Sequence, residues 1–307
     1  MTSKIPSWAL WRDGRGRLSP LRIITLAGLL WPAVLALGTI WLYGLGARPV
    51  NDLIHRTGFW AVVFLLVSLA ITPLSRIARF GQVMDVRRMI GVGAFAYAAA
   101  HFCLFIVDLH FDLVEAASEI VLRLYLTVGF VALLGLAALA ITSTDGMVRR
   151  LGGRRWMRLH QLSYLIALLA IIHFFQQTTL DGTIPTFVAG LFAWLMGYRL
   201  IQWWRNSRRE LPTIALLALT VVVSVLVFAI EAGVIAIVFG VSPWMVLQTA
   251  TDFELTVRPG WVVLGAGLAV VALDIVRLVW VRRMASRQPQ RASSRPIRAA
   301  KAETTAS

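Results

Sequence analysis

The chain has 307 residues, of which 58% are hydrophobic and only 15% charged, and its mean hydropathy of +0.75 excludes a water-soluble domain of this length. A net charge of +15 is common among nucleic-acid-binding proteins. Here, however, the arginines lie between long apolar segments. Membrane topology and attraction to the lipid bilayer therefore account for the charge, and nucleic acid is excluded as a partner.

Eight apolar segments are long enough to span a bilayer, and they predict an all-α, polytopic transmembrane bundle of about eight helices. Residues 1–21 are basic and precede the first segment. Because this segment is about 20 residues long, more than the core of a signal peptide, we interpret it as an uncleaved first helix. The segments cover approximately residues 22–43, 57–75, 88–109, 120–141, 159–177, 184–204, 212–240 and 261–281.

The basic residues predict the orientation of the bundle. Twenty-six of the 30 Lys and Arg residues lie before the first segment, after the last one, in alternate connections or at the segment ends that adjoin them. By the positive-inside rule, both the N- and the C-terminus are therefore cytoplasmic. The opposite connections carry Arg48, Arg56, Arg123 and Arg258, together with acidic residues such as Asp108, Asp112, Glu115 and Glu119.

Three histidines lie in or at the ends of apolar segments, where an ionisable ring is costly and needs a function. His101 lies in the third segment, and His160 and His173 lie in the fifth. Both segments are predicted to run outward from the cytoplasm, and the spacing from Arg88 to His101 equals that from His160 to His173. His101 and His173 are therefore predicted at the same depth, where both could bind one iron.

His160 is predicted about 20 Å from His173 along the helix, toward the cytoplasm, where it would face Arg87 or Arg88. This separation suits two stacked haems. An ideal helix would nevertheless place His160 and His173 about 140° apart in azimuth, so two haems require a tilt, a local distortion or an offset second haem. His55 and His110, in outer loops, are predicted to be solvated.

The cytoplasmic connection 143–158 combines Gly152 and Gly153 with five arginines. Such a loop could bind a flavin phosphate or haem propionates. The alternative is an ordinary basic loop with a tight turn, in which residues 142–145 end one helix and cap the next. The candidate contacts are Arg87, Arg88, Arg154, Arg155 and Arg158.

Four strings resemble the MsrQ (YedZ) family of the ferric-reductase-like transmembrane group: ITPLSR (71–76), RRMIGVGAFAYAAAH (87–101), ITSTDGMVRRLGGRRWMRLHQLSYLIALLAIIHFF (141–175) and GYR (197–199). The resemblance covers about residues 20–205, and His101, His160 and His173 each match a family histidine. It implies one or two b-type haems with these histidines as axial ligands, and an associated FMN. It also implies a multi-pass protein of the bacterial inner membrane that passes electrons from the quinone pool to the periplasmic molybdopterin subunit MsrP.

About 100 residues follow the matching part, and the resemblance says nothing about them. In this extension Glu231 is a candidate intramembrane functional carboxylate with no evident partner. Asp274 and Arg277 are expected to pair on one helical face. The predicted divisions are a cytoplasmic N-terminal segment (1–21), a haem-binding transmembrane domain (22–205), an extension with two further transmembrane helices (206–284) and a disordered basic cytoplasmic tail (285–307).

The favoured function is that of an electron-transfer subunit, distinct from the catalytic subunit, in a system that repairs oxidised periplasmic proteins. No glycine-rich nucleotide motif follows a strand, which disfavours a self-contained NADPH-driven reductase. Two alternatives stay open. One is a metalloreductase for ferric or cupric ions, and the other is a non-redox transporter or assembly factor with structural histidines.

Overall fold

The computed structural model describes residues 11, 17–44, 46–178, 182–205, 210–253 and 257–286. These residues contain eight helical spans that are long and apolar enough to cross a membrane, which confirms the predicted all-α, multi-pass fold. Most of segment 1–21 and of the tail 285–307 lies outside the described residues. The spans are α1 (Pro20–Tyr43), α2 (Pro49–Ile77), α3 (Met84–Asp108), α5 (Leu124–Ile141), α7 (Gly153–His160) with α8 (Leu162–Gln177), α9 (Thr183–Trp204), α10 (Thr213–Phe239) and α12 (Pro259–Ser286).

Short helices join the spans: α4 (Leu113–Leu122), α6 (Asp145–Leu151), α11 (Pro243–Gln248) and the 3-10 turns η1 (Gly81–Val83) and η2 (Thr249–Thr251). The fourth predicted span began at residue 120, but α5 begins at Leu124 because Arg123 has an extended backbone that separates it from α4. Asp112 caps α4, since its side chain accepts from the N–H groups of Val114 and Glu115 at 2.9 Å.

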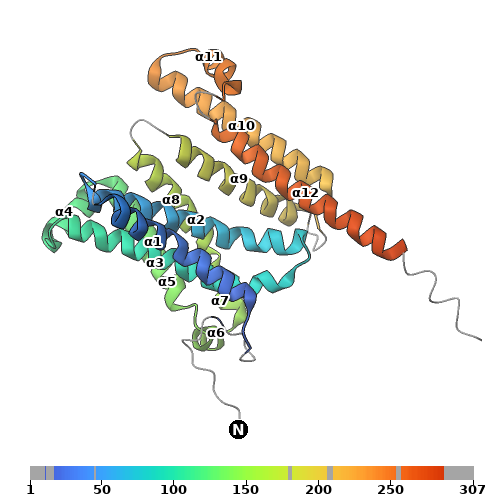
Figure 1. Cartoon of the computed structure of the whole chain (residues 1–307), viewed down its shortest axis with the longest axis horizontal. Coiled ribbons are helices and arrows are strands. Elements are labelled where there is room, and N and C mark those ends of the chain that lie inside the picture. Colours follow the sequence, from blue (N-terminus) through green and yellow to red (C-terminus); the bar gives the residue numbers. More distant parts are fainter. Residues whose placement is uncertain are drawn as a thin grey trace, which may run out of the picture.

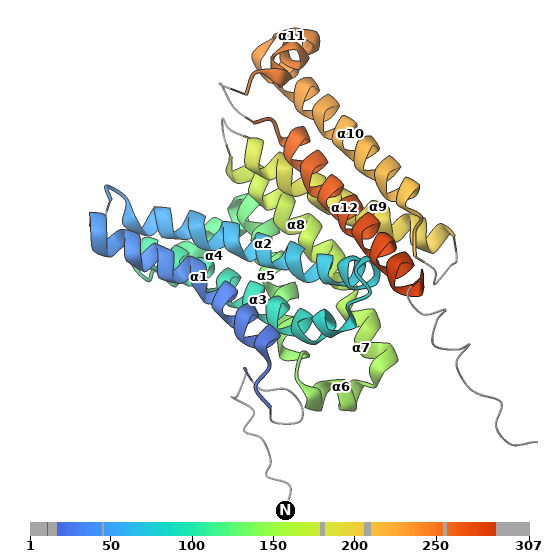
Figure 2. The same cartoon turned by 45° about the vertical axis from the view of Figure 1, so that its right-hand side comes forward.

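Four spans form the centre of the bundle. Helix α2 packs along α3, α5 packs along α8, and contacts of α3 with α5 and of α2 with α8 join the two pairs. Helix α1 lies outside this group, against α3 and α2 (Figure 1). Helix α9 contacts α2 and α8, and it also packs against α10 and α12, which lie on its far side (Figure 2). The extension is therefore attached mainly through α9.

The outer surface of the bundle suits a lipid environment. Large apolar side chains such as Trp31, Leu37, Val222 and Ile237 are exposed on α1 and α10. Exposed aromatic residues also gather at the ends of spans, as is typical of the two membrane interfaces. They include Trp41, Tyr43, Trp203, Trp204 and Trp280.

A proline inside α2 is complemented by an arginine from α9. Pro73 has no backbone N–H, so the carbonyl of Leu69 loses its helical donor. Arg199 Nη2 donates to this carbonyl at 2.6 Å, and its guanidinium lies over the ring of Tyr164 in α8, 5.1 Å from the centroid. The strings ITPLSR and GYR therefore meet in space and hold α2 to α9.

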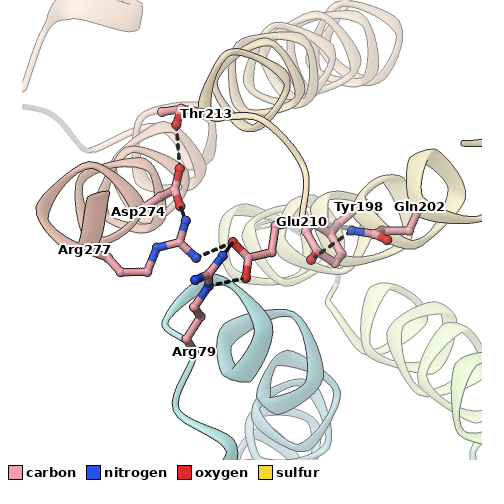
Figure 3. A network of polar contacts seen from close by, with 7 residues as sticks. All are labelled: Arg79, Tyr198, Gln202, Glu210, Thr213, Asp274 and Arg277. Atoms are coloured by element: carbon pink, nitrogen blue, oxygen red, sulfur yellow. Dashed lines mark hydrogen bonds and ion pairs between the residues drawn. The ribbon is translucent and has the colours of Figure 1, made fainter. Parts of the chain in front are cut away.

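An ion cluster joins the extension to α2 (Figure 3). Glu210, just before α10, accepts a 2.8 Å hydrogen bond from Arg79 Nε and also pairs with Arg277 of α12. Arg277 Nη2 lies 2.9 Å from Asp274 Oδ1, which confirms the pairing expected from their spacing. Thr213 Oγ1 donates to Asp274 Oδ2 at 2.6 Å. The cluster thus connects the end of α2 with α10 and α12.

Candidate cofactor site

His101 of α3 and His173 of α8 face each other in the centre of the bundle. Their ring centroids lie 6.2 Å apart, and the ring planes are inclined by 80°. Both side chains are partly buried. The structure thus brings together the two histidines for which the spacing predicted an equal depth.

Each imidazole is oriented by a main-chain carbonyl. His101 Nδ1 lies 2.8 Å from the carbonyl oxygen of Ile54 in α2, and His173 Nδ1 lies 2.7 Å from that of Tyr125 in α5. Because a carbonyl oxygen only accepts hydrogen bonds, Nδ1 carries the proton in each ring and Nε2 keeps its lone pair. A hydrogen bond at the second ring nitrogen is the usual support of a metal-binding histidine.

The distance between the rings fits a metal ion held between them. With a metal–nitrogen distance of about 2 Å and about 1.1 Å from the nitrogen to the ring centroid, two axial imidazoles have centroids about 6 Å apart. No group of three or more His, Cys, Asp or Glu side chains that could hold a metal ion occurs in the described part of the chain. Two imidazoles at this separation suit a metal whose remaining ligands come from a macrocycle, as in haem.

A cavity of about 460 Å³ surrounds the histidine pair. Its walls are largely apolar and include Phe59, Phe102 and Phe174, whereas polar side chains such as Asn51, His55 and Glu115 line one side. The volume lies in the range of cofactor pockets. Arg123 also lines the cavity and is held by Tyr125 and Glu119; its hydrogen bond to the Tyr125 hydroxyl and the charge of Glu119 raise the pKa of Arg123.

His160 lies apart from this pair, at the end of α7. At Gln161 the helix tightens to 3-10 hydrogen bonding, but Gln161 keeps helical dihedrals (φ −68°, ψ −22°), so α7 and α8 together form one span with a local irregularity. The His160 ring stacks on Trp156 with centroids 4.0 Å apart, and its Nε2 lies 3.3 Å from Thr142 Oγ1. Among the described residues, no second imidazole is paired with it.

The candidate arginines do not line the cavity around His101 and His173. Arg87 is half-buried and within electrostatic range of His160, whereas Arg88 donates to Asp145 at 2.6 Å. The expected cap is present, since Thr144 Oγ1 accepts from the N–H of Met147, and Gly152 takes a positive φ of 75° between α6 and α7. The remaining candidates are exposed on α7: Arg154, Arg155 and Arg158.

The expectation that Glu231 has no evident partner is wrong. Arg258 Nη1 donates to Glu231 Oε1 at 3.2 Å, and Arg258 Nη2 donates to Thr249 Oγ1 at 3.1 Å. The sequence concealed this pair because the hairpin from α10 through α11 to α12 brings together residues 27 positions apart. A buried carboxylate that is paired in this way favours a structural role.

Sequence reasoning did not identify Ile54 and Tyr125, which orient the two histidines. Both contribute a main-chain carbonyl, and a pattern of side chains in the sequence does not show which carbonyl a histidine ring will contact. The histidine spacing was a usable signal because it reflects depth in the membrane. The carbonyls depend on how α2 and α5 pack beside α3 and α8.

Comparisons with known proteins match about half of the chain or less. Residues 57–171 match the family described as ferric reductase like transmembrane component. The protein-methionine-sulfoxide reductase heme-binding subunit MsrQ of Xanthomonas euvesicatoria pv. vesicatoria is 46% identical over 167 residues, which cover 54% of this chain and 75% of the relative. The MsrQ of Herminiimonas arsenicoxydans is 41% identical over 181 residues, which cover 54% of this chain and 83% of the relative. No solved structure matches the chain.

The long matches cover three quarters or more of each of these relatives, and the eight apolar spans agree with a membrane-embedded subunit. The chain is therefore a multi-pass membrane protein that belongs to the MsrQ family.

Proposed function

We propose that this chain binds haem b through His101 and His173 and transfers single electrons to the methionine-sulfoxide reductase MsrP on the periplasmic side of the bacterial inner membrane. The observation that carries the proposal is the pair of facing imidazoles, each with Nδ1 hydrogen-bonded to a carbonyl and Nε2 free. The names of the relatives, heme-binding subunits of protein-methionine-sulfoxide reductase, support it.

When bound, haem supplies a one-electron carrier. His101 and His173 would hold the iron, which would then carry single electrons rather than react with oxygen. The hydrogen bonds from Nδ1 to Ile54 and Tyr125 fix the ring orientations and raise the basicity of Nε2. The aromatic walls of the cavity limit the access of water.

The proposed donor is the quinone pool, and the chain acts as an electron-transfer subunit while MsrP performs catalysis. We assign His160 to a second cofactor site on the cytoplasmic side, which takes a second haem or FMN. The half-buried Arg87 is within electrostatic range of His160 and suits a propionate or a flavin phosphate. Arg88, Arg154, Arg155 and Arg158 are the other proposed contacts of this site.

An absorption spectrum of the purified protein, with haem quantified per chain, tests the proposal. We expect a Soret band, reduction of the haem by a quinol, and reoxidation by MsrP. Reoxidation by ferric chelates with no response to MsrP would instead indicate a metalloreductase. A stably inserted protein without a Soret band would contradict both redox functions and leave a transporter or assembly role.

A further inference from the structure

The two facing histidines are held by the same arrangement of backbone and glycine. In α2, the carbonyl of Ile54 that accepts from His101 is followed four residues later by Gly58. In α5, the carbonyl of Tyr125 that accepts from His173 is followed four residues later by Gly129. The repetition at both imidazoles indicates a geometric requirement.

The glycines admit the imidazoles because they lack a Cβ. A Cβ at Gly58 would lie 2.9 Å from His101 Nδ1, and a Cβ at Gly129 would lie 2.8 Å from both Nδ1 and Cε1 of His173. Residues four apart lie above one another on a helix, so a side chain at the second position crowds the approach to the first carbonyl. That carbonyl already accepts from its own helix, but a second lone pair remains for a ring that can come close.

We propose that Gly58 and Gly129 are positioning residues that set the rotation of the two imidazoles and keep their planes nearly perpendicular. This inference rests on the proposed function, because it concerns the axial ligands of that haem. Hydrogen bonding at Nδ1 and iron binding at Nε2 each leave a ring some freedom to rotate. Close contact with the helix backbone at a glycine removes that freedom.

The inclination of 80° between the ring planes has a spectroscopic consequence. Perpendicular imidazoles donate π-electrons to iron along two different directions, which keeps two of the iron d orbitals close in energy. Ferric low-spin haem of this kind has an EPR signal with a large maximum g value, whereas parallel planes give a rhombic signal with a smaller one. The wild-type protein is expected to show the large-g signal.

The test compares Gly58→Ala and Gly129→Ala with Gly135→Ala in the full-length, haem-loaded protein. Gly135 is a matched control because it also lies in α5, and a Cβ there would meet only the side chain of Ile166, at 2.8 Å. The measurements are the ferric EPR spectrum, the midpoint potential and the rate of haem transfer to apomyoglobin. We expect a smaller maximum g value, a shifted potential and about 10- to 100-fold faster haem transfer in the first two variants, and wild-type values in the control.

A double-mutant cycle separates contact with the ring from a general packing defect. In the His101→Gly background with free imidazole supplied, Gly58→Ala is expected to have a much smaller effect, because the ring is no longer tethered to α3 and can move away from the new Cβ. The same comparison tests the positioning role of Gly58 if the single variant Gly58→Ala does not accumulate in the membrane.

Unchanged EPR, potential and haem transfer in both glycine variants would overturn the positioning role while leaving the proposed function intact. Equal effects of Gly135→Ala, or an undiminished effect of Gly58→Ala in the His101→Gly background, would overturn it as well. A wild-type protein without haem would instead contradict the proposed function itself.

Discussion

In the proposed site, removal of either facing imidazole would delete one of two ligands of a shared iron. His101→Ala and His173→Ala are therefore each expected to abolish the same haem component, and haem per chain together with reduced-minus-oxidised spectra measures the loss. His110→Asn is a suitable control, because His110 is exposed and Asn tolerates its positive φ of 53°. Loss of different spectral components in the two alanine variants would show that the histidines do not share one iron.

His160 allows a separate test, because it lies outside the cavity of the facing pair. His160→Ala is expected to leave the His101–His173 haem unchanged and to remove or weaken a second cofactor on the cytoplasmic side. Haem and flavin quantified per chain, before and after the substitution, measure the effect. One haem per chain, no flavin and an unchanged spectrum would make His160 a structural residue that packs on Trp156 and Thr142.

The sequence could identify these three histidines because ionisable rings stand out in apolar segments and equal spacing reports equal depth. It could not identify the glycines at 58 and 129 as neighbours of the rings, since glycine is common in transmembrane helices and its role depends on the packing of a second helix. The partner of Glu231 was missed for a similar reason, because Arg258 reaches it only through the fold of the hairpin.

Hydropathy predicted the long elements well and the short ones less well. A run of about 20 apolar residues specifies a span regardless of what packs on it. The 3-10 tightening at Gln161 and the separate helix α4 depend instead on local hydrogen bonds, such as those of the Asp112 cap. The predicted span starting at 120 merged these elements because apolar residues continue across Arg123.

The ion cluster that attaches α12 to α2 contains one exposed arginine and one largely covered arginine. The Arg277 side chain is 12% exposed and faces two carboxylates, whereas the Arg79 side chain is 64% exposed. Arg277→Ala is expected to destabilise the protein by up to about 3–5 kcal/mol, because it leaves the buried Asp274 without its cationic partner. Thermal unfolding in detergent measures the loss.

Arg79→Gly serves as the matched comparison in the same cluster. It removes an exposed, solvent-screened ion pair, and it also relieves the positive φ of 51° at a position that favours glycine. We therefore expect a much smaller change in the unfolding temperature than for Arg277→Ala. A decrease in stability as large as that of Arg277→Ala would show that the exposed pair of Arg79 and Glu210 holds the extension to α2.

The same cluster makes the attachment of the extension dependent on pH. Burial raises the pKa of Glu210, but hydrogen bonds from Arg79 and Arg277 and their charges outweigh it and hold that pKa below its ordinary value. A carboxylate of this kind stabilises the fold above its unfolded pKa of about 4.3, and the stabilisation is lost as the pH falls through the folded-state pKa. The protection of α12 amides from hydrogen exchange, relative to their intrinsic rates, is expected to fall below about pH 4.

Glu210→Gln is the control for this pH dependence, because it keeps the shape of the side chain and removes the titrating group. The variant is expected to exchange faster than the wild type at neutral pH and to respond less to acid. An equal acid response in both proteins would assign the effect to other carboxylates, such as Asp274.

At the scale of the whole molecule, the extension and the histidine pair occupy different parts of the bundle. Helices α10 and α12 pack mainly on α9, whereas His101 and His173 lie on α3 and α8. A chain truncated after residue 210 is therefore expected to retain the haem, and haem per chain measures this. It loses contacts such as the 3.0 Å hydrogen bond from Trp194 Nε1 to Thr220, at a cost of about 1 kcal/mol each.

Loss of haem in a truncated chain that still inserts stably would show that the extension belongs to the redox core. Retention of haem with loss of electron delivery to MsrP would instead assign the extension to partner docking. The division at residues 205 and 206 stays a prediction until that experiment is done.

The position of α9 between the two parts has a consequence for biosynthesis. All helices around His101 and His173 precede α10 in the chain, and translation at about 5–20 residues per second needs roughly 5–20 s for the residues after Trp204. The histidine pocket is therefore complete while α10 and α12 are still being made, and a cofactor can enter before the extension docks. During this interval the face of α9 that carries Gly190 and Trp194 is in contact with lipid, until α10 arrives to cover it.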